Sequence, residues 1–100
     1  MKEELKNTND LEAFLNKNQI FDLLGTDTIG VFGSFARGEK SNDIDILLEN
    51  IKEKQKIIQV QEELERKTGL KFDIVIDELA NPIILHRAKK DLIYVKKHKK

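Results

Sequence analysis

The sequence contains no cysteine and only one proline among its 100 residues. Without cysteine there can be no disulfide, no thiolate metal ligand and no cysteine nucleophile. This absence fits a reducing compartment, and we expect a cytoplasmic protein. Net charge is also absent, because 18 basic residues balance 18 acidic ones. No global field therefore attracts or repels nucleic acid.

Long apolar runs are missing as well. None approaches the roughly 18 residues that a membrane-spanning helix needs, and the charged residues 1–6 do not resemble a signal peptide. We therefore expect no membrane partner. Apolar residues make up 39% of the chain, which suffices for one modest core. The length is typical of one domain, so we predict a single domain over residues 1–100, with a frayed tail at 96–100.

Hydrophobic periodicity and turn residues predict alternating helices and strands. Asp10 is a plausible N-cap for the first helix, and Gly69 a plausible C-cap for the third. The helix at 53–67 is long enough to cross over between two parallel strands. The predicted helices cover 10–24 with a break near 16–18, 34–37, 53–67 and 82–90, and the predicted strands cover 28–32, 43–48, 72–76 and 92–95.

A glycine-serine turn and a pair of aspartates are the most informative features. Gly33 and Ser34 leave one predicted strand, and Asp43 and Asp45 begin the next. Side chains two apart on a strand point to the same face, so both carboxylates aim at one point. Glycine permits close backbone approach, and the N–H groups at the following helical turn can hold a phosphate. Arg37 can clamp a phosphate too.

A third aspartate, Asp73, lies near the start of the strand that follows the crossover helix. Parallel strands start at the same end of a sheet, so Asp73 is expected beside Asp43 and Asp45. Three converging carboxylates repel one another unless a cation joins them. Mg²⁺ prefers such oxygen ligands. Two such ions, about 4 Å apart, can activate an attacking oxygen and neutralise a leaving phosphate.

Each feature alone has a simpler interpretation. Asp43 can cap a turn, and Asp45 and Asp73 can be solvent-facing strand residues. The glycine-serine pair can be an ordinary strand-to-helix turn, and Arg37 can form a surface ion pair with Glu39 or an aspartate. Only the combination of these features favours a site for a metal ion and a nucleotide.

Two other interpretations fit less well. Residues 33–41 nearly match the phosphate-binding loop G-x-x-x-x-G-K-[ST], but Glu39 separates Gly38 from Lys40 and puts the lysine out of register. The lysine-rich tail can bind nucleic acid, but a solvated terminus is the simpler interpretation in a chain of zero net charge. We therefore do not expect a nucleic acid partner.

The combined pattern resembles the DNA polymerase beta-like nucleotidyltransferase superfamily, in particular its minimal, antitoxin-type members. The resemblance implies an α/β (α+β) fold in which helices flank a mixed β-sheet. The loop at 39–42 is short for this family, and Asn42 stands where serine more often precedes the first aspartate. The residues that carry the resemblance are Gly33-Ser34-Phe35-Ala36-Arg37-Gly38, Asp43-Ile44-Asp45, and Asp73 in Phe72-Asp73-Ile74-Val75.

The resemblance further implies Mg²⁺-dependent transfer of AMP from ATP to a hydroxyl acceptor, with two metal ions. Its catalytic residues and metal ligands are implied to be Asp43, Asp45 and Asp73. Gly33 and Ser34 are implied to hold the triphosphate, and Arg37 is the further phosphate-binding candidate.

The acceptor is the open part of this interpretation. Larger members of the superfamily carry extra substrate domains, for which this chain has no room. Stand-alone members resemble antitoxins that adenylylate a small helical toxin of the HEPN family. The alternative is a non-catalytic antitoxin or scaffold that neutralises its partner by forming a complex.

Overall fold

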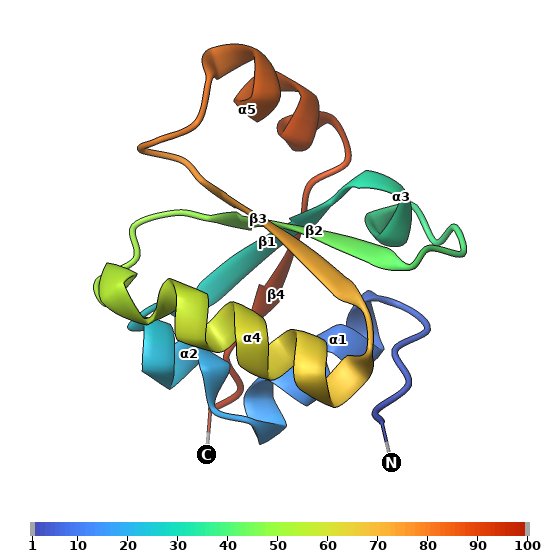
Figure 1. The fold of residues 1–100 in the computed structure, drawn as a ribbon. Coiled ribbons are helices and arrows are strands. Elements are labelled where there is room, and N and C mark those ends of the chain that lie inside the picture. The colour runs from blue at the N-terminus through green and yellow to red at the C-terminus, as the bar shows by residue number, and fades with distance from the viewer. Residues whose placement is uncertain (1, 100) are drawn as a thin grey trace.

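The computed structural model describes residues 2–99. Helices and strands alternate along the chain in the predicted order (Figure 1). The strands at 28–32 and 43–48 and the helix at 82–90 have the predicted bounds, and the other predicted elements differ by a few residues at one or both ends. The elements are α1 (Thr8–Lys17), α2 (Ile20–Leu24), β1 (Thr28–Phe32), α3 (Gly33–Ala36), β2 (Asp43–Leu48), η1 (Lys54–Lys56), α4 (Ile57–Thr68), β3 (Lys71–Ile76), α5 (Pro82–Lys90) and β4 (Ile93–Lys96).

The N-cap predicted for the first helix is wrong. Asn7 is the N-cap, and its Oδ1 accepts a hydrogen bond from the backbone N–H of Asp10 at 2.9 Å. Asp10 lies in the first turn, where its negative charge interacts favourably with the partial positive charge at the N-terminal end of the helix. Asp10 is the third residue after Asn7, and an N-cap side chain ordinarily binds the backbone N–H of the second or third residue after it. At α5 the N-cap is Asn81, whose Oδ1 accepts a hydrogen bond from the backbone N–H of Ile83 at 2.8 Å, and Pro82 takes the first helical position, which needs no N–H donor.

The sheet is mixed, with the strand order β3-β2-β1-β4. Strand β1 is antiparallel to both of its neighbours, whereas β2 and β3 are parallel. The chain between β2 and β3 passes through η1 and α4, which form the predicted crossover. The prediction of a mixed β-sheet flanked by helices is therefore confirmed.

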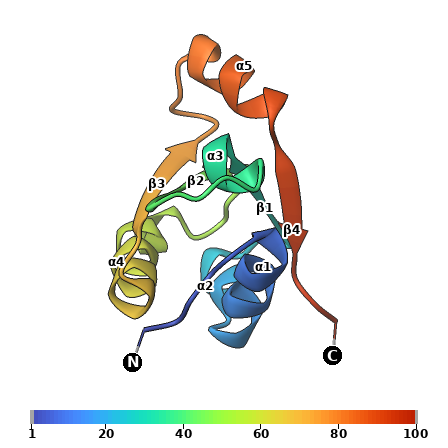
Figure 2. The same cartoon turned by 90° about the vertical axis from the view of Figure 1, so that its right-hand side faces the viewer.

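One face of the sheet packs against α1, α2 and α4, and α5 lies on the opposite side (Figures 1 and 2). In β2 the side chains of Ile44, Ile46 and Leu48 are buried in the core beneath these helices. Because side chains alternate along a strand, Asp43 and Asp45 face the other side of the sheet. None of the helices formed by residues 2–99 has the length and apolar content that crossing a bilayer requires.

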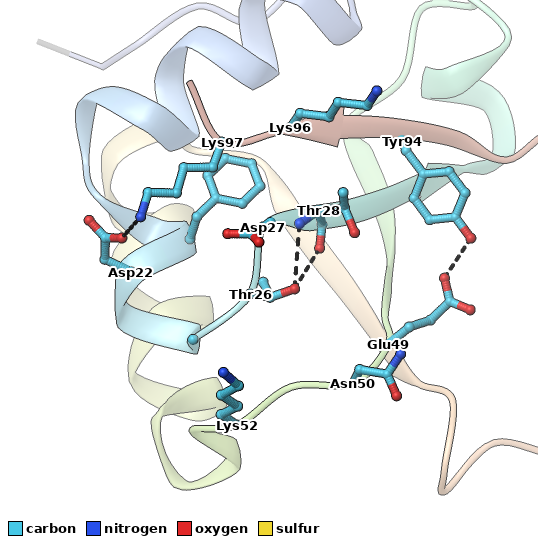
Figure 3. Close-up of a pocket in the computed structure, with 12 residues that line it drawn as sticks. Asp22, Thr26, Asp27, Thr28, Glu49, Asn50, Lys52, Tyr94, Lys96 and Lys97 are labelled. Atoms are coloured by element: carbon cyan, nitrogen blue, oxygen red, sulfur yellow. Dashed lines mark hydrogen bonds and ion pairs between the residues drawn. The ribbon is translucent and has the colours of Figure 1, made fainter. Parts of the chain in front are cut away.

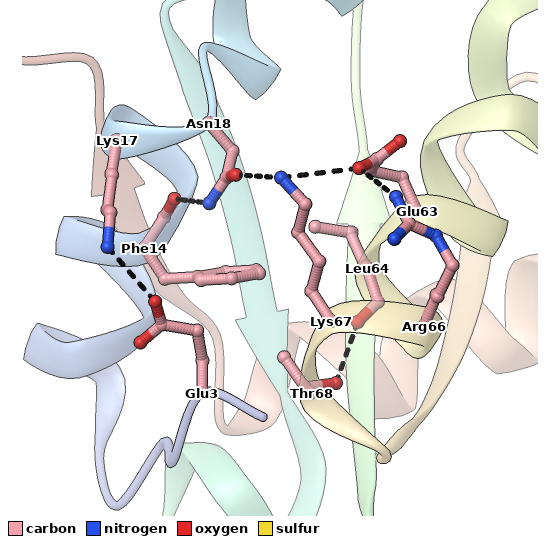
Figure 4. A network of polar contacts seen from close by, with 9 residues as sticks. All are labelled: Glu3, Phe14, Lys17, Asn18, Glu63, Leu64, Arg66, Lys67 and Thr68. Atoms are coloured by element: carbon pink, nitrogen blue, oxygen red, sulfur yellow. Dashed lines mark hydrogen bonds and ion pairs between the residues drawn. The ribbon is translucent and has the colours of Figure 1, made fainter. Parts of the chain in front are cut away.

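Polar contacts join α1 to α4 at the rim of this core (Figure 4). Lys67 Nζ donates to Asn18 Oδ1 at 2.5 Å and pairs with Glu63 Oε1 at 3.2 Å. Asn18 is the C-cap residue of α1, so the contact ties the end of one helix to the last turn of the other. Gly69 ends α4 with φ +73°, as its predicted role as a C-cap requires.

The tail predicted to be frayed is partly held against the protein. Lys96 belongs to β4, and its backbone N–H donates to Glu12 Oε2 at 2.8 Å. The backbone N–H of Lys97 donates to the carbonyl of Asp27 at 2.9 Å, and that of His98 to Asn16 Oδ1 at 2.7 Å. The prediction is therefore wrong for residues 96–98, because side chains of α1 and the chain before β1 satisfy their backbone groups. Residue 100 lies outside the described residues.

Leu64→Ala is expected to destabilise the fold by about 2–5 kcal/mol, because Leu64 is 1% exposed and its removal leaves a cavity in the core. Ile58→Ala on the same helix is the matched control. Ile58 is 69% exposed, so its truncation should change stability by only about 0.5 kcal/mol. Urea unfolding of both variants measures the difference. Equal losses would contradict the assignment of the buried face of α4.

Candidate functional site

Strand register brings together the two sequence motifs. In the parallel pair β2 and β3, Asp45 is the register partner of Asp73. In the antiparallel pair β1 and β2, Phe32 is the register partner of Asp45. Gly33 follows Phe32 directly, so the glycine-serine turn starts beside Asp45. Asp43 lies two residues before Asp45 on β2, so both side chains lie on the same face of the sheet.

Gly33 and the carboxylate of Asp45 are in close contact. A Cβ added at residue 33 would lie 2.2 Å from Asp45 Oδ2 and 3.2 Å from Asp45 Cγ. Gly33 also has φ +75°, a conformation that other residues adopt at a cost. Two independent constraints, space and backbone conformation, therefore require glycine at this position.

The Ala-Arg-Gly part of the motif ends α3 in a Schellman arrangement. The backbone N–H of Glu39 donates to the carbonyl of Ser34 at 3.0 Å, and that of Gly38 donates to Phe35 at 3.1 Å. Gly38 has φ +81°, as this helix ending requires. The first turn of α3 directs backbone N–H groups, including that of Ser34, away from the helix. These donors and the Ser34 hydroxyl lie one step along the chain from the contact with Asp45.

The three aspartates differ in environment. Asp45 is partly buried, Asp43 is exposed, and Asp73 forms an ion pair of 3.5 Å with Lys71. Partial burial and the negative charges of Asp73 and Asp43 raise the pKa of the Asp45 carboxyl above its ordinary value. The cluster is thus electrostatically unfavourable when all its members are ionised.

A divalent cation would relieve this repulsion, and the donors are of the type that Mg²⁺ prefers. Within residues 2–99, no three histidine, cysteine, aspartate or glutamate side chains lie close enough to enclose an ion. The structure therefore places Asp45 and Asp73 side by side and Asp43 near them, without a closed metal site. Asp43 is exposed and the side chain of Asp73 is 44% exposed, so neither carboxylate is held in place by packing.

Arg37 forms the ion pairs that the simpler interpretation anticipated. Its Nε donates to Glu39 Oε2 at 2.8 Å, and its Nη1 donates to Asp91 Oδ2 at 2.7 Å. The hydrogen bond with Arg37 lowers the pKa of the Glu39 carboxyl, and Glu39 and Asp91 in turn raise the pKa of the guanidinium. The positive charge of Arg37 also opposes, in part, the rise in the pKa of the Asp45 carboxyl. Arg37 therefore interacts electrostatically with the aspartate cluster.

Side chains that the sequence analysis did not single out support the aspartates. The Ser41 hydroxyl donates to the carbonyl of Asp43 at 2.7 Å and accepts from its backbone N–H at 3.1 Å. Serine thus supports the first aspartate from two residues before it, next to Asn42, where the family pattern has serine. The spacing of a serine two residues before an aspartate was the available signal, because Ser side chains often bond the backbone two residues on.

Two further residues fix the backbone beside Asp73. Gln61 Nε2 donates to the carbonyl of Phe72 at 2.7 Å, and the backbone N–H of Phe72 donates to Glu65 Oε2 at 2.8 Å. Both side chains come from α4, four residues apart and therefore on one helix face. They satisfy the backbone N–H and carbonyl of Phe72, the residue before Asp73, and so help to set the position of Asp73.

A cleft of about 730 Å³ lies at the other end of the sheet (Figure 3). It contains none of the predicted site residues. Its polar groups are partly paired with one another, since Lys97 Nζ bonds Asp22 Oδ1 at 2.5 Å and Tyr94 Oη donates to Glu49 Oε1 at 2.6 Å. The aspartate cluster, with its unbalanced charge and adjoining helix start, is the better candidate for a site.

The chain matches the model of the family described as Polymerase beta, Nucleotidyltransferase over residues 9–99. It is 34% identical over 92 residues to protein adenylyltransferase MntA of Thermococcus cleftensis, a match that covers 86% of this chain and 93% of that protein. It is 32% identical over 100 residues to a putative protein adenylyltransferase of Methanocaldococcus jannaschii, covering 91% of this chain and 100% of that protein.

A crystal structure of a mutant toxin-antitoxin MntA-HpeT is similar in fold, with a TM-score of 0.63 and 21% sequence identity. The match covers 85% of this chain and 75% of that chain. At this identity the likeness concerns the fold, and it agrees with the mixed sheet and flanking helices.

Gly33→Ala is expected to destabilise the protein more than Gly38→Ala. Both glycines have positive φ, so each substitution costs about 1–2 kcal/mol in backbone strain. Only at residue 33 does the new Cβ also meet Asp45, because nothing lies within 4 Å of a Cβ at Gly38. Such a clash typically adds about 1–3 kcal/mol. Urea unfolding compares the two, and the excess should shrink in an Asp45→Ala background. Equal losses would contradict the close contact.

Asp45→Asn is expected to stabilise the metal-free protein near pH 7. Because its pKa is raised in the folded protein, Asp45 contributes favourably to the free energy of unfolding only while it is protonated. This contribution is fully present below the ordinary pKa of 3.8 and is lost as the pH rises through the higher folded-state value. The advantage of the variant should therefore shrink as the pH falls towards 4. Urea unfolding with a chelator present measures it.

Asp22→Asn is the matched control for this experiment, because Asp22 is exposed and paired with Lys97. Removal of its charge should not stabilise the protein and should cost at most about 1 kcal/mol. A wild-type chain that is more stable than Asp45→Asn near pH 7 would contradict the assigned repulsion.

Proposed function

This chain belongs to the Polymerase beta, Nucleotidyltransferase family and is a nucleotidyltransferase, and on that basis we propose that it transfers AMP from ATP to a hydroxyl group on a partner protein. The relatives named protein adenylyltransferases support this choice of nucleotide and acceptor, since they match most of this chain and most of their own length.

The observation that carries the proposal is the shared register at Asp45. The same residue stands beside Asp73 on one neighbouring strand and against Gly33 at the end of the other. Carboxylates for a metal ion and backbone donors for phosphate therefore meet at one end of the sheet. Phosphoryl-transfer chemistry requires positioning and neutralisation of charge rather than a covalent intermediate.

The residues of the chain have distinct proposed roles. The backbone N–H groups at Ser34 and the Ser34 hydroxyl bind the triphosphate, and Gly33 lets it approach. Arg37 binds a phosphate oxygen. Asp73 accepts the proton of the acceptor hydroxyl, whose oxygen forms a bond to the α-phosphorus. The bond from that phosphorus to the bridging oxygen breaks, and pyrophosphate leaves.

Asp43, Asp45 and Asp73 are the proposed ligands of Mg²⁺, with two ions as the expected number. Their oxygen donors and the repulsion among them fit such a group. When bound, the ions would supply positive charge to the phosphates and lower the pKa of the attacking hydroxyl. A metal ion at Asp73 would compete with the ion pair that this carboxylate forms with Lys71.

The proposed acceptor is a small helical toxin of the HEPN type, which would make this chain an antitoxin. The structure of similar fold is that of a toxin-antitoxin, which supports a toxin partner. The surface offers a further observation, because Leu79, Ile83 and Ile84 are 79%, 64% and 47% exposed. These apolar side chains lie in α5 and just before it, on the side of the sheet that carries the aspartates.

The same exposed side chains favour a second candidate function, neutralisation of the toxin by binding alone. An apolar surface of this kind stabilises a complex whether or not chemistry follows. The two functions differ in their dependence on the aspartates, since binding through α5 does not need Asp45 or Asp73.

Incubation of the chain with Mg²⁺, ATP labelled on the α-phosphate and the product of the neighbouring gene is expected to label that protein. Asp45→Asn and Asp73→Asn should each lower the rate at least about 100-fold, because each removes a charge that stabilises the transition state. Transfer of the label, measured by gel and mass spectrometry, checks this expectation.

Asp77→Asn is the matched control, because Asp77 follows β3 at the opposite end from Asp73 and an asparagine can still accept the hydrogen bond from Glu78. It should retain the wild-type rate. Loss of label transfer with retained neutralisation of the toxin by Asp45→Asn would favour the binding function. No transfer by the wild-type chain, with the same result for all variants, would contradict the catalytic proposal.

A further inference from the structure

Asp91 occupies a position that is electrostatically unfavourable. It is the C-cap residue of α5, and the C-terminal end of a helix carries partial negative charge that favours cations. The last turn of α5 follows this rule with Arg87, Lys89 and Lys90. Asp91 departs from it, and its carboxylate accepts a hydrogen bond from Arg37 Nη1. The interaction with Arg37 therefore offsets the unfavourable placement of Asp91.

Arg37 is held from two directions. Glu39, two residues along the chain, accepts from Nε and makes a longer contact of 3.5 Å with Nη2. Asp91, which is 54 residues away in the sequence, accepts from Nη1. A planar guanidinium that is held at both sides has a fixed plane as well as a fixed position. These contacts leave part of its donor fork available to a further anion.

The backbone at the end of α3 explains how Glu39 reaches Arg37. Arg37 is the C-cap residue of α3, and the positive φ of Gly38 turns the chain so that Glu39 returns beside it. The same helix begins at Gly33, in contact with Asp45. The two ends of this single helical turn thus present the phosphate donors and the guanidinium together.

We infer that Asp91 is a positioning residue for nucleotide binding: together with Glu39 it holds the Arg37 guanidinium in the orientation that receives the triphosphate, and it ties the end of α5 to the site. The inference rests on the proposed function, because it requires a nucleotide at this end of the sheet. Asp91 does not touch the nucleotide, and it acts through Arg37.

The test measures the Kd of Mg²⁺-ATP by isothermal titration calorimetry, with no acceptor present. Asp91→Asn should weaken binding about two- to fivefold, the size expected of one exposed ion pair. Glu39→Gln should act in the same direction. Asp91→Glu, which keeps the charge, should restore most of the affinity. Asp22→Asn breaks an exposed aspartate–lysine pair away from the site and should leave the Kd unchanged.

A double-mutant cycle separates positioning from a structural role. In an Arg37→Gln background, Asp91→Asn should have no further effect on the Kd, because its partner is absent. An additive loss in that background would overturn the inference, as would unchanged or tighter binding by Asp91→Asn alone. Tighter binding would mean that Asp91 competes with the triphosphate for Arg37.

The proposed function and this inference fail in different ways. If the wild-type chain binds no Mg²⁺-ATP, the proposed function fails and the inference falls with it. If the wild-type chain binds Mg²⁺-ATP and Asp91→Asn binds equally well, only the inference fails. Thermal unfolding of each variant, followed by circular dichroism, shows that the compared proteins are folded.

Discussion

The carboxylate of Asp45 can lie against the chain at residue 33 only because that residue is glycine. The contact depends on the register of β1 and β2, which sets Phe32 opposite Asp45. It also depends on the core, since burial of Ile44 and Ile46 turns Asp45 to the other face of the sheet. The helical turn that starts at Gly33 is thereby fixed beside the aspartates. The positions of the proposed phosphate and metal groups follow from this one close approach.

The elements and the meeting of the aspartates could be predicted from local patterns. A short run of β-branched and aromatic residues predicts β1. The helix between β2 and β3 is long enough to be a crossover between parallel strands, and the observed parallel pairing places Asp73 beside Asp45. The helix start at Asn7 was missed because Asp10 is also a good capping residue, and only the observed hydrogen bond distinguishes the two. The side chains that hold the tail in place come from α1, far away in the sequence.

The supporting contacts of the site could not be predicted, because they join residues that the fold alone brings together. Arg37 and Asp91 are 54 residues apart, and no periodicity relates them. Gln61 and Glu65 read as ordinary polar residues of an amphipathic helix, and their bonds to Phe72 depend on how α4 lies along β3.

The proposed function depends most on a divalent cation that binds with the nucleotide beside Gly33, Asp45 and Asp73. The most direct measurement adds substoichiometric Mn²⁺ to the ¹⁵N-labelled chain with ATP and records paramagnetic broadening of the amide signals. The account predicts that the signals of Gly33, Ser34, Asp45 and Asp73 broaden first. Broadening centred instead on Asp22 and Asp27, beside the cleft at the other end of the sheet, would contradict it.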